Sequence, residues 1–344
     1  MVASFGEILL RLSTPANERI LQANSMEVHY GGSESNVVAS LSILGHNTKF
    51  ISRVPANEIG NAAINSLRTH GVDVSHISKG GDRLGIYFLE TGTALRQSNV
   101  LYDRKHSAFS YIRPDSIDWN QALNNVTWFH WSGITPAVSQ AAAETLKHVL
   151  KVASDKGIFI SADLNYRKKL WDYGMKPYEV MPELIEYCDM ISGGNEDSEP
   201  MFGIKVPLAN DDFSVESEIS LIEQRCFIWK NAFPKLKYIA STIRRSRTAT
   251  HNFFSGALWD GKEIKIAEGF EINPITDRVG GGDAFMAGII HGLICYPENT
   301  QKAIDFAVAA GALKHTIKGD VNLSTISEIE RMMTTGNKSL RIIR

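Results

Sequence analysis

The chain has 344 residues, of which 43% are hydrophobic and 22% charged, the usage of a globular protein whose core needs no disulfide or metal. A formal net charge of −2 provides no field that would hold a polyanion, which argues against nucleic-acid binding. Neither a signal peptide nor a bilayer-spanning run is predicted. The widely spaced cysteines form no CxxC or Cys/His pattern, so we expect reduced thiols in a cytoplasmic protein without a membrane partner.

Strand-length apolar runs alternate with longer helical patterns along the chain. Glycines close several of the helical patterns, as is typical of C-caps. This alternation predicts an α/β fold with a mostly parallel central sheet and helices on both faces. We expect strands over residues 2–12, 48–54, 128–131, 158–164 and 238–242 with another at Met190, and helices over 35–44, 59–69, 140–156, 178–187 and 221–232.

Two segments, about 12–30 and 85–111, interrupt the alternation. Both are rich in strand formers without a helical pattern, which predicts strands of a small separate sheet. Ligands of open α/β sheets bind outside the carboxyl ends of the strands, and lids exclude water there. We therefore favour a lid over a crevice, within a single domain over 1–344. The alternative is an edge extension of the main sheet.

The stretch DRVGGGDAFMAG, residues 277–288, is the most informative motif. Its glycines, Gly280, Gly281 and Gly282, directly precede Asp283 and a helical pattern. Glycines let backbone N–H groups approach a ligand, and a helix N-terminus adds about half a positive charge, so this is an anion site suited to phosphate. Asp283 would accept the proton of an attacking hydroxyl during phosphoryl transfer. The alternative is a glycine-rich loop whose aspartate only caps the helix.

GGGDAFMAG and, near the other end of the chain, GGSESNVV at 31–38 resemble the two signatures of the ribokinase, or PfkB, family of carbohydrate kinases. FGEILLRL, GIYFLE, LYDRKHSA, FHWSGITP, DLNYRKKLW and LKHTIKGD are similar to the 2-keto-3-deoxygluconate kinases of that family. The resemblance implies a ribokinase-like fold with a β-sheet lid and ATP-dependent phosphorylation of 2-keto-3-deoxygluconate to its 6-phosphate. It also implies Mg²⁺ as cofactor and a homo-oligomer through the lid.

By this resemblance, Asp283 is the general base, and the backbone of residues 280–283 forms the anion hole. Gly31, Gly32 and Asn36 match the sugar-binding signature. The glycines would let the sugar approach the backbone, and the amide of Asn36 would bond hydroxyls. The alternative for the glycine pair is a plain turn before a helix. Family members often have alanine where Gly281 stands.

Four side chains carry the expectation of an acidic substrate. Tyr102 and Arg104 are two residues apart, so on a lid strand they would share a face. Arg167 follows an expected strand at its carboxyl end, and Tyr87 lies earlier in the same lid segment as Tyr102 and Arg104, 85–111. Arginine binds a carboxylate bidentately, and a tyrosine hydroxyl adds a hydrogen bond. Solvent-facing arginines are the alternative.

Asn195 and Glu196 resemble the family's acidic motif for magnesium and phosphate. Ser198, however, stands where the motif has an acid. Glu196, Asp197 or Glu199 could substitute through water, since magnesium usually keeps several waters. The magnesium ligand therefore stays open, with Glu196 as one candidate.

Thr242 and Arg244 follow another expected strand, near where the family holds nucleotide phosphates, although glycine is frequent at the position of Arg244. We interpret the arginines of 243–247 as a solvated loop in which one arginine contacts ATP. The alternative is a basic nucleic-acid patch, for which three arginines in a chain of balanced charge are weak support. His130 and Trp131 are expected in a core strand, and His315 in packing beside the adenine pocket.

Two other functions stay open at this point. One is a kinase for a neutral sugar such as fructose, which has less need of the lid tyrosine and arginine. The other is a catalytically silent sugar-binding protein on the same fold, against which the retained Asp283 and its glycine loop argue.

Overall fold

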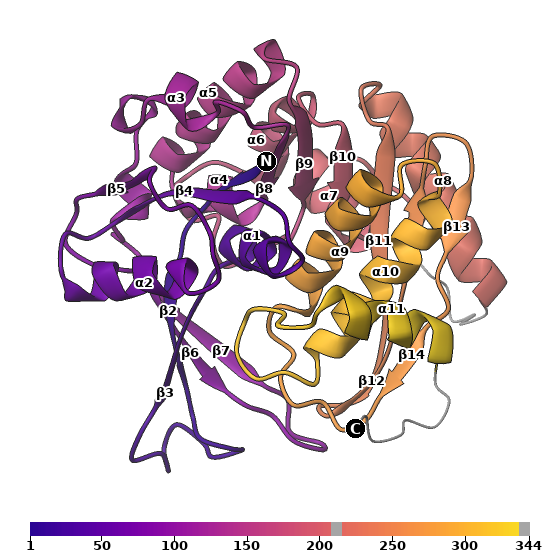
Figure 1. Cartoon of the computed structure of the whole chain (residues 1–344), viewed down its shortest axis with the longest axis horizontal. Coiled ribbons are helices and arrows are strands. Elements are labelled where there is room, and N and C mark those ends of the chain that lie inside the picture. Colours follow the sequence, from indigo (N-terminus) through magenta and orange to yellow (C-terminus); the bar gives the residue numbers. More distant parts are fainter. Residues whose placement is uncertain (208–214, 337–344) are drawn as a thin grey trace.

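The computed structural model describes residues 1–207 and 215–336, which form two sheets with flanking helices (Figure 1). The strands of the larger sheet are β1 (Val2–Phe5), β4 (Thr48–Val54), β5 (Ile77–Lys79), β8 (Trp128–Ser132), β9 (Phe159–Asp163), β10 (Met190–Ser192), β11 (Tyr238–Thr248), β12 (His251–Trp259), β13 (Ile264–Ile266) and β14 (Phe270–Ile272). Their order is β13-β12-β11-β10-β9-β8-β1-β4-β5, with β14 also paired to β12.

Strands β5, β4, β1, β8, β9, β10 and β11 are parallel to their neighbours, and β12 joins β11 in antiparallel orientation. Parallel pairing places the carboxyl ends of these strands along one edge of the sheet. Loops that follow β8, β9, β10 and β11 therefore meet on the side where ligands of open α/β sheets bind.

Helices cover both faces of this sheet (Figure 1). Among the described residues, none of them combines the length and apolar composition needed to cross a membrane. The helices are α1 (Ser33–Ile43), α2 (Glu58–Arg68), α3 (Trp119–Ala122), α4 (Ile134–Val138), α5 (Gln140–Asp155), α6 (Pro177–Ile185), α7 (Asn195–Phe202), α8 (Val215–Ala232), α9 (Gly281–Cys295), α10 (Thr300–Lys314) and α11 (Ile326–Thr335).

Successive strand residues enter two different hydrophobic cores, because side chains alternate across a sheet. Trp128 of β8 packs in the core formed with α1, α9, α10 and α11, whereas Phe129 packs in the core formed with α5, α6, α7 and α8. Met190 and Ile191 of β10 divide in the same way. The predicted α/β class with a mostly parallel sheet covered on both faces is confirmed.

A smaller sheet projects from the body of the molecule (Figure 1). Its order is β3-β2-β6-β7, with β2 (Leu9–Ser13), β3 (Glu27–Gly31), β6 (Ile86–Glu90) and β7 (Asn99–Asp103). The predicted small separate sheet is thus present, and it is not an edge extension of the larger sheet.

Three details of the strand prediction are wrong. The strand expected over 238–242 continues as β11 to Thr248, so the arginines of 243–247 lie in a strand paired with β12 and not in a loop. Residues 2–12 form two strands, β1 and β2, in different sheets. The chain changes sheet at Gly6, where a Cβ atom would lie 2.3 Å from the carboxylate of Glu34, so backbone packs directly against that side chain. The second lid segment stops being a strand after Asp103, because Phe109 lies in a 3₁₀ turn and is buried in the main core.

The interpretation of His130 as a core residue fits its surroundings. The side chain is fully buried on β8, and its Nδ1 lies 3.0 Å from the hydroxyl oxygen of Ser161. Burial lowers the pKa of His130 to about 3, so the ring is neutral at physiological pH. Trp131 is fully buried in the same strand, and neither residue lines the cavity described next.

Candidate active site

A cavity of about 970 Å³ lies between the smaller sheet and the carboxyl edge of the larger one. Its walls come from β6 and β7, from the loops after β9 and β10, from β11 and from the start of α9. The sequence-predicted residues that line it are Gly32, Asn36, Tyr87, Tyr102, Arg104, Arg167, Glu196, Thr242, Arg244, Gly280, Gly281, Gly282 and Asp283.

Two predicted residues, Gly31 and Asn195, do not line the cavity. Gly31 ends β3 where a Cβ atom would lie 2.6 Å from the carboxylate of Asp320, so this glycine permits a backbone–side-chain contact. The amide of Asn195 donates to the carbonyl of Pro207 at 2.6 Å and accepts from Arg225. These contacts make Asn195 a residue that holds the start of α7.

The glycine loop forms the N-terminus of α9. Gly280 is its N-cap with φ of 81°, a left-handed conformation that favours glycine, and a Cβ there would lie 1.9 Å from the carbonyl oxygen of Asp320. The N–H of Gly281 donates to the carbonyl of Arg278 at 3.3 Å. Within the described part of the chain, the N–H groups of Gly280, Gly282 and Asp283 have no protein acceptor. Free donors at a helix N-terminus form an anion cradle.

The position of Gly281 leaves no room for a Cβ atom, although the resembling family often has alanine there. A Cβ atom there would lie 2.7 Å from the ring of His315. That ring is buried, its Nδ1 lies 2.7 Å from the carbonyl oxygen of Gly311, and it packs against Phe254. His315 is thus a packing residue beneath the glycine loop, in agreement with the packing role expected for it.

Asp283 is held by side chains of α1. Ser33 donates its hydroxyl to one carboxylate oxygen at 2.9 Å, and Asn36 donates its amide to the other at 2.7 Å. Asn165, after β9, donates in turn to Ser33 at 3.1 Å. Burial raises the pKa of Asp283 to about 6, against the opposing effect of these hydrogen bonds. A carboxylate with a pKa near the working pH is suited to a general base.

Asp163 is a cavity residue that the sequence analysis did not assign. It ends β9, within the quoted segment DLNYRKKLW, which is the signal that could have identified it. Burial, together with the charges of Asp283 and Asp197, raises its pKa to about 8. An acid that stays protonated at neutral pH becomes ionised when a cation arrives, so Asp163 is suited to face a metal or a phosphate-bound metal.

Two of the four residues expected to bind an acidic substrate already have partners. Arg104 forms a buried ion pair with Glu7, and the hydroxyl of Tyr87 donates to the carboxylate of Asp320. Because β7 ends at Asp103, Arg104 lies just beyond the strand, with its guanidinium 5.9 Å from the centre of the Tyr102 ring. Tyr87 and Arg104 therefore shape the cavity wall while their polar groups are balanced by protein.

Three arginines that line the cavity lie close enough to one another for their charges to interact. Arg167 is exposed to the cavity and has no acceptor among the described residues. Arg278, a second unassigned residue, donates to the carbonyls of Thr248 and Ala249 and to Asn252. Partial burial and the charges of Arg278 and Arg167 lower the pKa of Arg244. Like charges gathered without carboxylate partners favour a polyanionic ligand.

Acidic residues at the start of α7 line the same cavity. Glu196 and Asp197, both in the first turn of α7, line the cavity, while Ser198 is buried and accepts the indole N–H of Trp229 at 2.9 Å. Burial raises the pKa of Asp197 to about 6. Of the candidate magnesium ligands, Glu196 and Asp197 thus face the cavity, and Glu199 does not.

These elements together can transfer a phosphoryl group. A buried carboxylate can accept the proton of a hydroxyl, N–H donors at a helix N-terminus can stabilise a transferred phosphoryl group, and arginines can hold the phosphates of its donor. The class of protein that such a site defines is a kinase for small hydroxyl compounds.

Known proteins identify the family. The model of the pfkB family carbohydrate kinases matches residues 1–225. A 2-dehydro-3-deoxygalactonokinase of Haloferax volcanii is 30% identical, with 98% of each chain covered. A 2-dehydro-3-deoxygluconokinase crystal structure from Thermotoga maritima is 39% identical with a TM-score of 0.89, covering 97% of this chain and 98% of that one. A 2-dehydro-3-deoxygluconokinase of Thermoproteus tenax is 25% identical, with 93% and 89% covered. The chain belongs to the pfkB family of carbohydrate kinases and is a sugar kinase.

Proposed function

We propose that the protein transfers the γ-phosphoryl group of ATP to the terminal hydroxyl of 2-keto-3-deoxygluconate, giving the 6-phosphate and ADP. The observation that carries the acidic substrate is Arg167, a guanidinium that faces the same cavity as Asp283 without a protein acceptor. A guanidinium binds a carboxylate through two parallel hydrogen bonds, whereas a neutral sugar offers no such partner. Similarity to kinases of 2-dehydro-3-deoxy sugar acids supports this choice.

The reaction follows from the contacts of Asp283. Its carboxylate, oriented by Ser33 and Asn36, takes the proton as the substrate oxygen bonds to the γ-phosphorus. The bond between that phosphorus and the bridging oxygen breaks, and ADP leaves with the electron pair. Negative charge on the phosphoryl oxygens is stabilised by the N–H groups of Gly282 and Asp283.

The residues present fit ATP and Mg²⁺. Three backbone donors without an acceptor among the described residues suit phosphate oxygens. The guanidinium of Arg244 has no carboxylate partner in the described part of the chain, and Thr242 lines the same cavity. Glu196, Asp197 and Asp163 offer carboxylate oxygens, the ligands that Mg²⁺ prefers. When bound, the cation neutralises charge on the transferred phosphate. The smaller sheet, whose Tyr87 and Tyr102 face the cavity, serves in this proposal as the lid that excludes water.

The test is an ADP-release assay with ATP and Mg²⁺ that compares 2-keto-3-deoxygluconate with fructose, ribose and gluconate. We expect a large preference in kcat/KM for the keto acid, and we expect Arg167→Ala to weaken the keto acid far more than a neutral sugar. Lys168→Ala, an exposed neighbour outside the cavity, is the matched control. A preference for fructose, or equal loss on both substrates in Arg167→Ala, would overturn the proposed substrate while leaving the sugar kinase.

The 4-epimer, 2-keto-3-deoxygalactonate, is the second candidate. The Haloferax volcanii relative named for that substrate is 30% identical over 98% of the chain. Both epimers carry the carboxylate that Arg167 would bind, so Arg167 does not discriminate between them. The same assay with the two epimers measures the discrimination directly.

We also propose a homo-oligomer that forms through the smaller sheet. Tyr87 lines the cavity, and Arg11, which the register pairs with it, lies on the same face of the sheet. The other face carries an apolar row in which the register pairs Leu12 with Val28 and Phe88, and Phe88 with Leu101. Val28 and Leu101 are 57% and 52% exposed. A second copy that covers the row would remove this apolar area from water.

Sedimentation velocity tests the assembly. Leu101→Lys is expected to dissociate it. Leu323→Lys, an equally exposed leucine in the loop between α10 and α11, is expected to leave it intact. A monomeric wild-type protein contradicts the proposal.

A further inference from the structure

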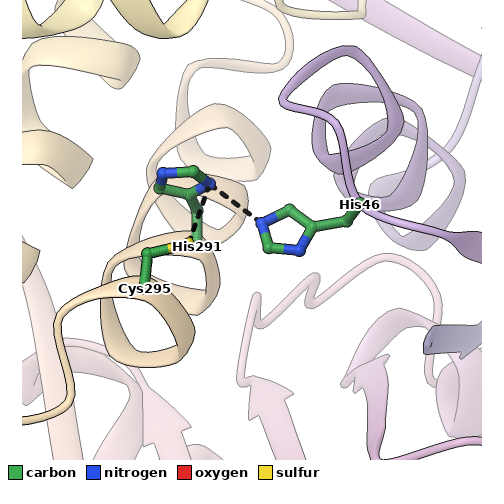
Figure 2. Close-up of side chains that lie close together, drawn as sticks. All are labelled: His46, His291 and Cys295. Atoms are coloured by element: carbon green, nitrogen blue, oxygen red, sulfur yellow. Dashed lines mark hydrogen bonds between the residues drawn. The ribbon is translucent and has the colours of Figure 1, made fainter.

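Three potential metal ligands meet at the C-terminal ends of α1 and α9 (Figure 2). His46 follows the end of α1, and His291 and Cys295 lie in the last turns of α9. The Nε2 atom of His46 lies 2.9 Å from Nδ1 of His291, and Sγ of Cys295 lies 3.9 Å from that same nitrogen. All three ligand atoms lie within 4.8 Å of one another.

The three ligand atoms are spaced close to the separations found between ligands of a tetrahedral metal site. Residues four apart on a helix share a face, so His291 and Cys295 present their ligand atoms together. Zinc binds nitrogen at about 2.0–2.1 Å and sulfur at about 2.3 Å, which puts neighbouring ligand atoms roughly 3.3–3.7 Å apart. The observed separations of 2.9 and 3.9 Å lie just below and just above that range, and the third pair lies within 4.8 Å, so small side-chain rotations would bring the three ligand atoms around one ion.

The contact between the two rings is a hydrogen bond of 2.9 Å. A neutral imidazole has one N–H and one lone pair, so one of the two facing nitrogens donates to the other. A metal would replace this hydrogen bond, with that proton moving to the outer nitrogen of its ring, and would displace the thiol proton of Cys295.

We propose that His46, His291 and Cys295 bind Zn²⁺, a borderline-soft divalent cation, with water as the fourth ligand. Nitrogen and thiolate ligands in a small tetrahedral set select Zn²⁺ over Mg²⁺ or Ca²⁺. The ion joins α1 to α9 at the ends opposite Asn36 and Asp283. His291 lies eight residues from Asp283, about 12 Å along the helix axis, so the ion acts as a structural clamp on the two helices that orient the base.

The first test is titration of the metal-free full-length protein with Co²⁺, whose absorption reports the ligands, followed by competition with Zn²⁺. We expect one ion per chain, a thiolate-to-cobalt charge-transfer band, and release of about one proton per ion from Cys295. Cys295→Ser should abolish the band, and His46→Asn should weaken affinity by about tenfold or more, because losing a ligand costs at least as much as losing its outer-shell partner.

The control is His148→Asn, which removes an exposed histidine of α5 and should leave the titration unchanged. Zn²⁺ should also raise the thermal midpoint of the wild type and of His148→Asn, because a ligand that binds only the folded state stabilises it. That rise should be absent in Cys295→Ser. No stoichiometric Co²⁺ binding, a band that survives in Cys295→Ser, or equal weakening in His46→Asn and His148→Asn would each overturn the site. These outcomes are independent of which sugar is phosphorylated.

Discussion

Replacing Arg11 by methionine removes the centre of a buried charge network. Arg11 lies on β2, and its guanidinium donates to Asp277 at 2.6 Å and to Asp320 at 3.0 Å, with side chains that are at most 5% exposed. Burial alone would lower the pKa of Arg11, but the charges of Asp320 and Asp277 outweigh it and raise this pKa, so the group stays charged. The methionine variant keeps much of the volume and leaves two buried carboxylates with one cation fewer.

The expected cost follows from that imbalance. Breaking a buried ion pair by removing one partner costs about 3–5 kcal/mol. Lys314, fully buried nearby, interacts with both carboxylates and compensates part of the charge. We therefore expect Arg11→Met to lower the free energy of unfolding by about 3 kcal/mol, the lower end of that range. We also expect a fall in kcat, because Asp277 accepts the N–H of Val279 at 3.0 Å beside the glycine loop.

Urea unfolding of the Arg11→Met variant measures the loss, with Arg83→Met as the control. Arg83 pairs with Asp103 beside the same sheet, but both side chains are well exposed, at 36% and 48%. An exposed pair contributes about 0–1 kcal/mol. Equal losses in the two variants would refute the argument that burial makes the Arg11 network costly to break.

Further predictions concern the cavity. Gly280→Ala should abolish turnover, because the residue has a positive φ and the new Cβ would lie 1.9 Å from the carbonyl oxygen of Asp320. Gly282→Ala should fold normally, because a Cβ there would have no atom within 4 Å. Circular dichroism checks the folding of both variants, and ADP-release rates measure their turnover. The acid limb of kcat/KM should lie near pH 6, where Asp283 ionises. Arg167→Ala should move it to higher pH, since Arg167 lowers that pKa; a fixed limb would contradict the assignment. The pKa of Asp163 is raised from the ordinary 3.8 to about 8, so between these values the folded state holds a proton that the unfolded state has lost. The metal-free protein should therefore lose stability as the pH rises from about 4 to 8, and Asp163→Asn should lose less. Thermal midpoints measured at about pH 5 and pH 8 check this.

Local signals predicted most elements of the fold. The helix expected over 140–156 is observed as α5, Gln140–Asp155, because an amphipathic period, a serine N-cap and a closing glycine define it locally. The division of 2–12 into two strands was missed, since continuous apolar character does not reveal a change of sheet. What divides them is the close approach of Glu34 to Gly6, a contact between distant parts of the chain.

The glycine loop and Asp283 were determined by the sequence itself, because three adjacent glycines before an acid and a helical pattern leave few alternatives for the backbone. Only the tertiary structure decided the electrostatic partners: Glu7 for Arg104, Asp320 for Tyr87, the two carboxylates for Arg11, and Asp163 beside Asp283. Periodicity indicates which face of an element is buried but not which distant residue lies opposite it. Whether an arginine is free to bind substrate or is already balanced therefore depends on packing between segments far apart in the chain.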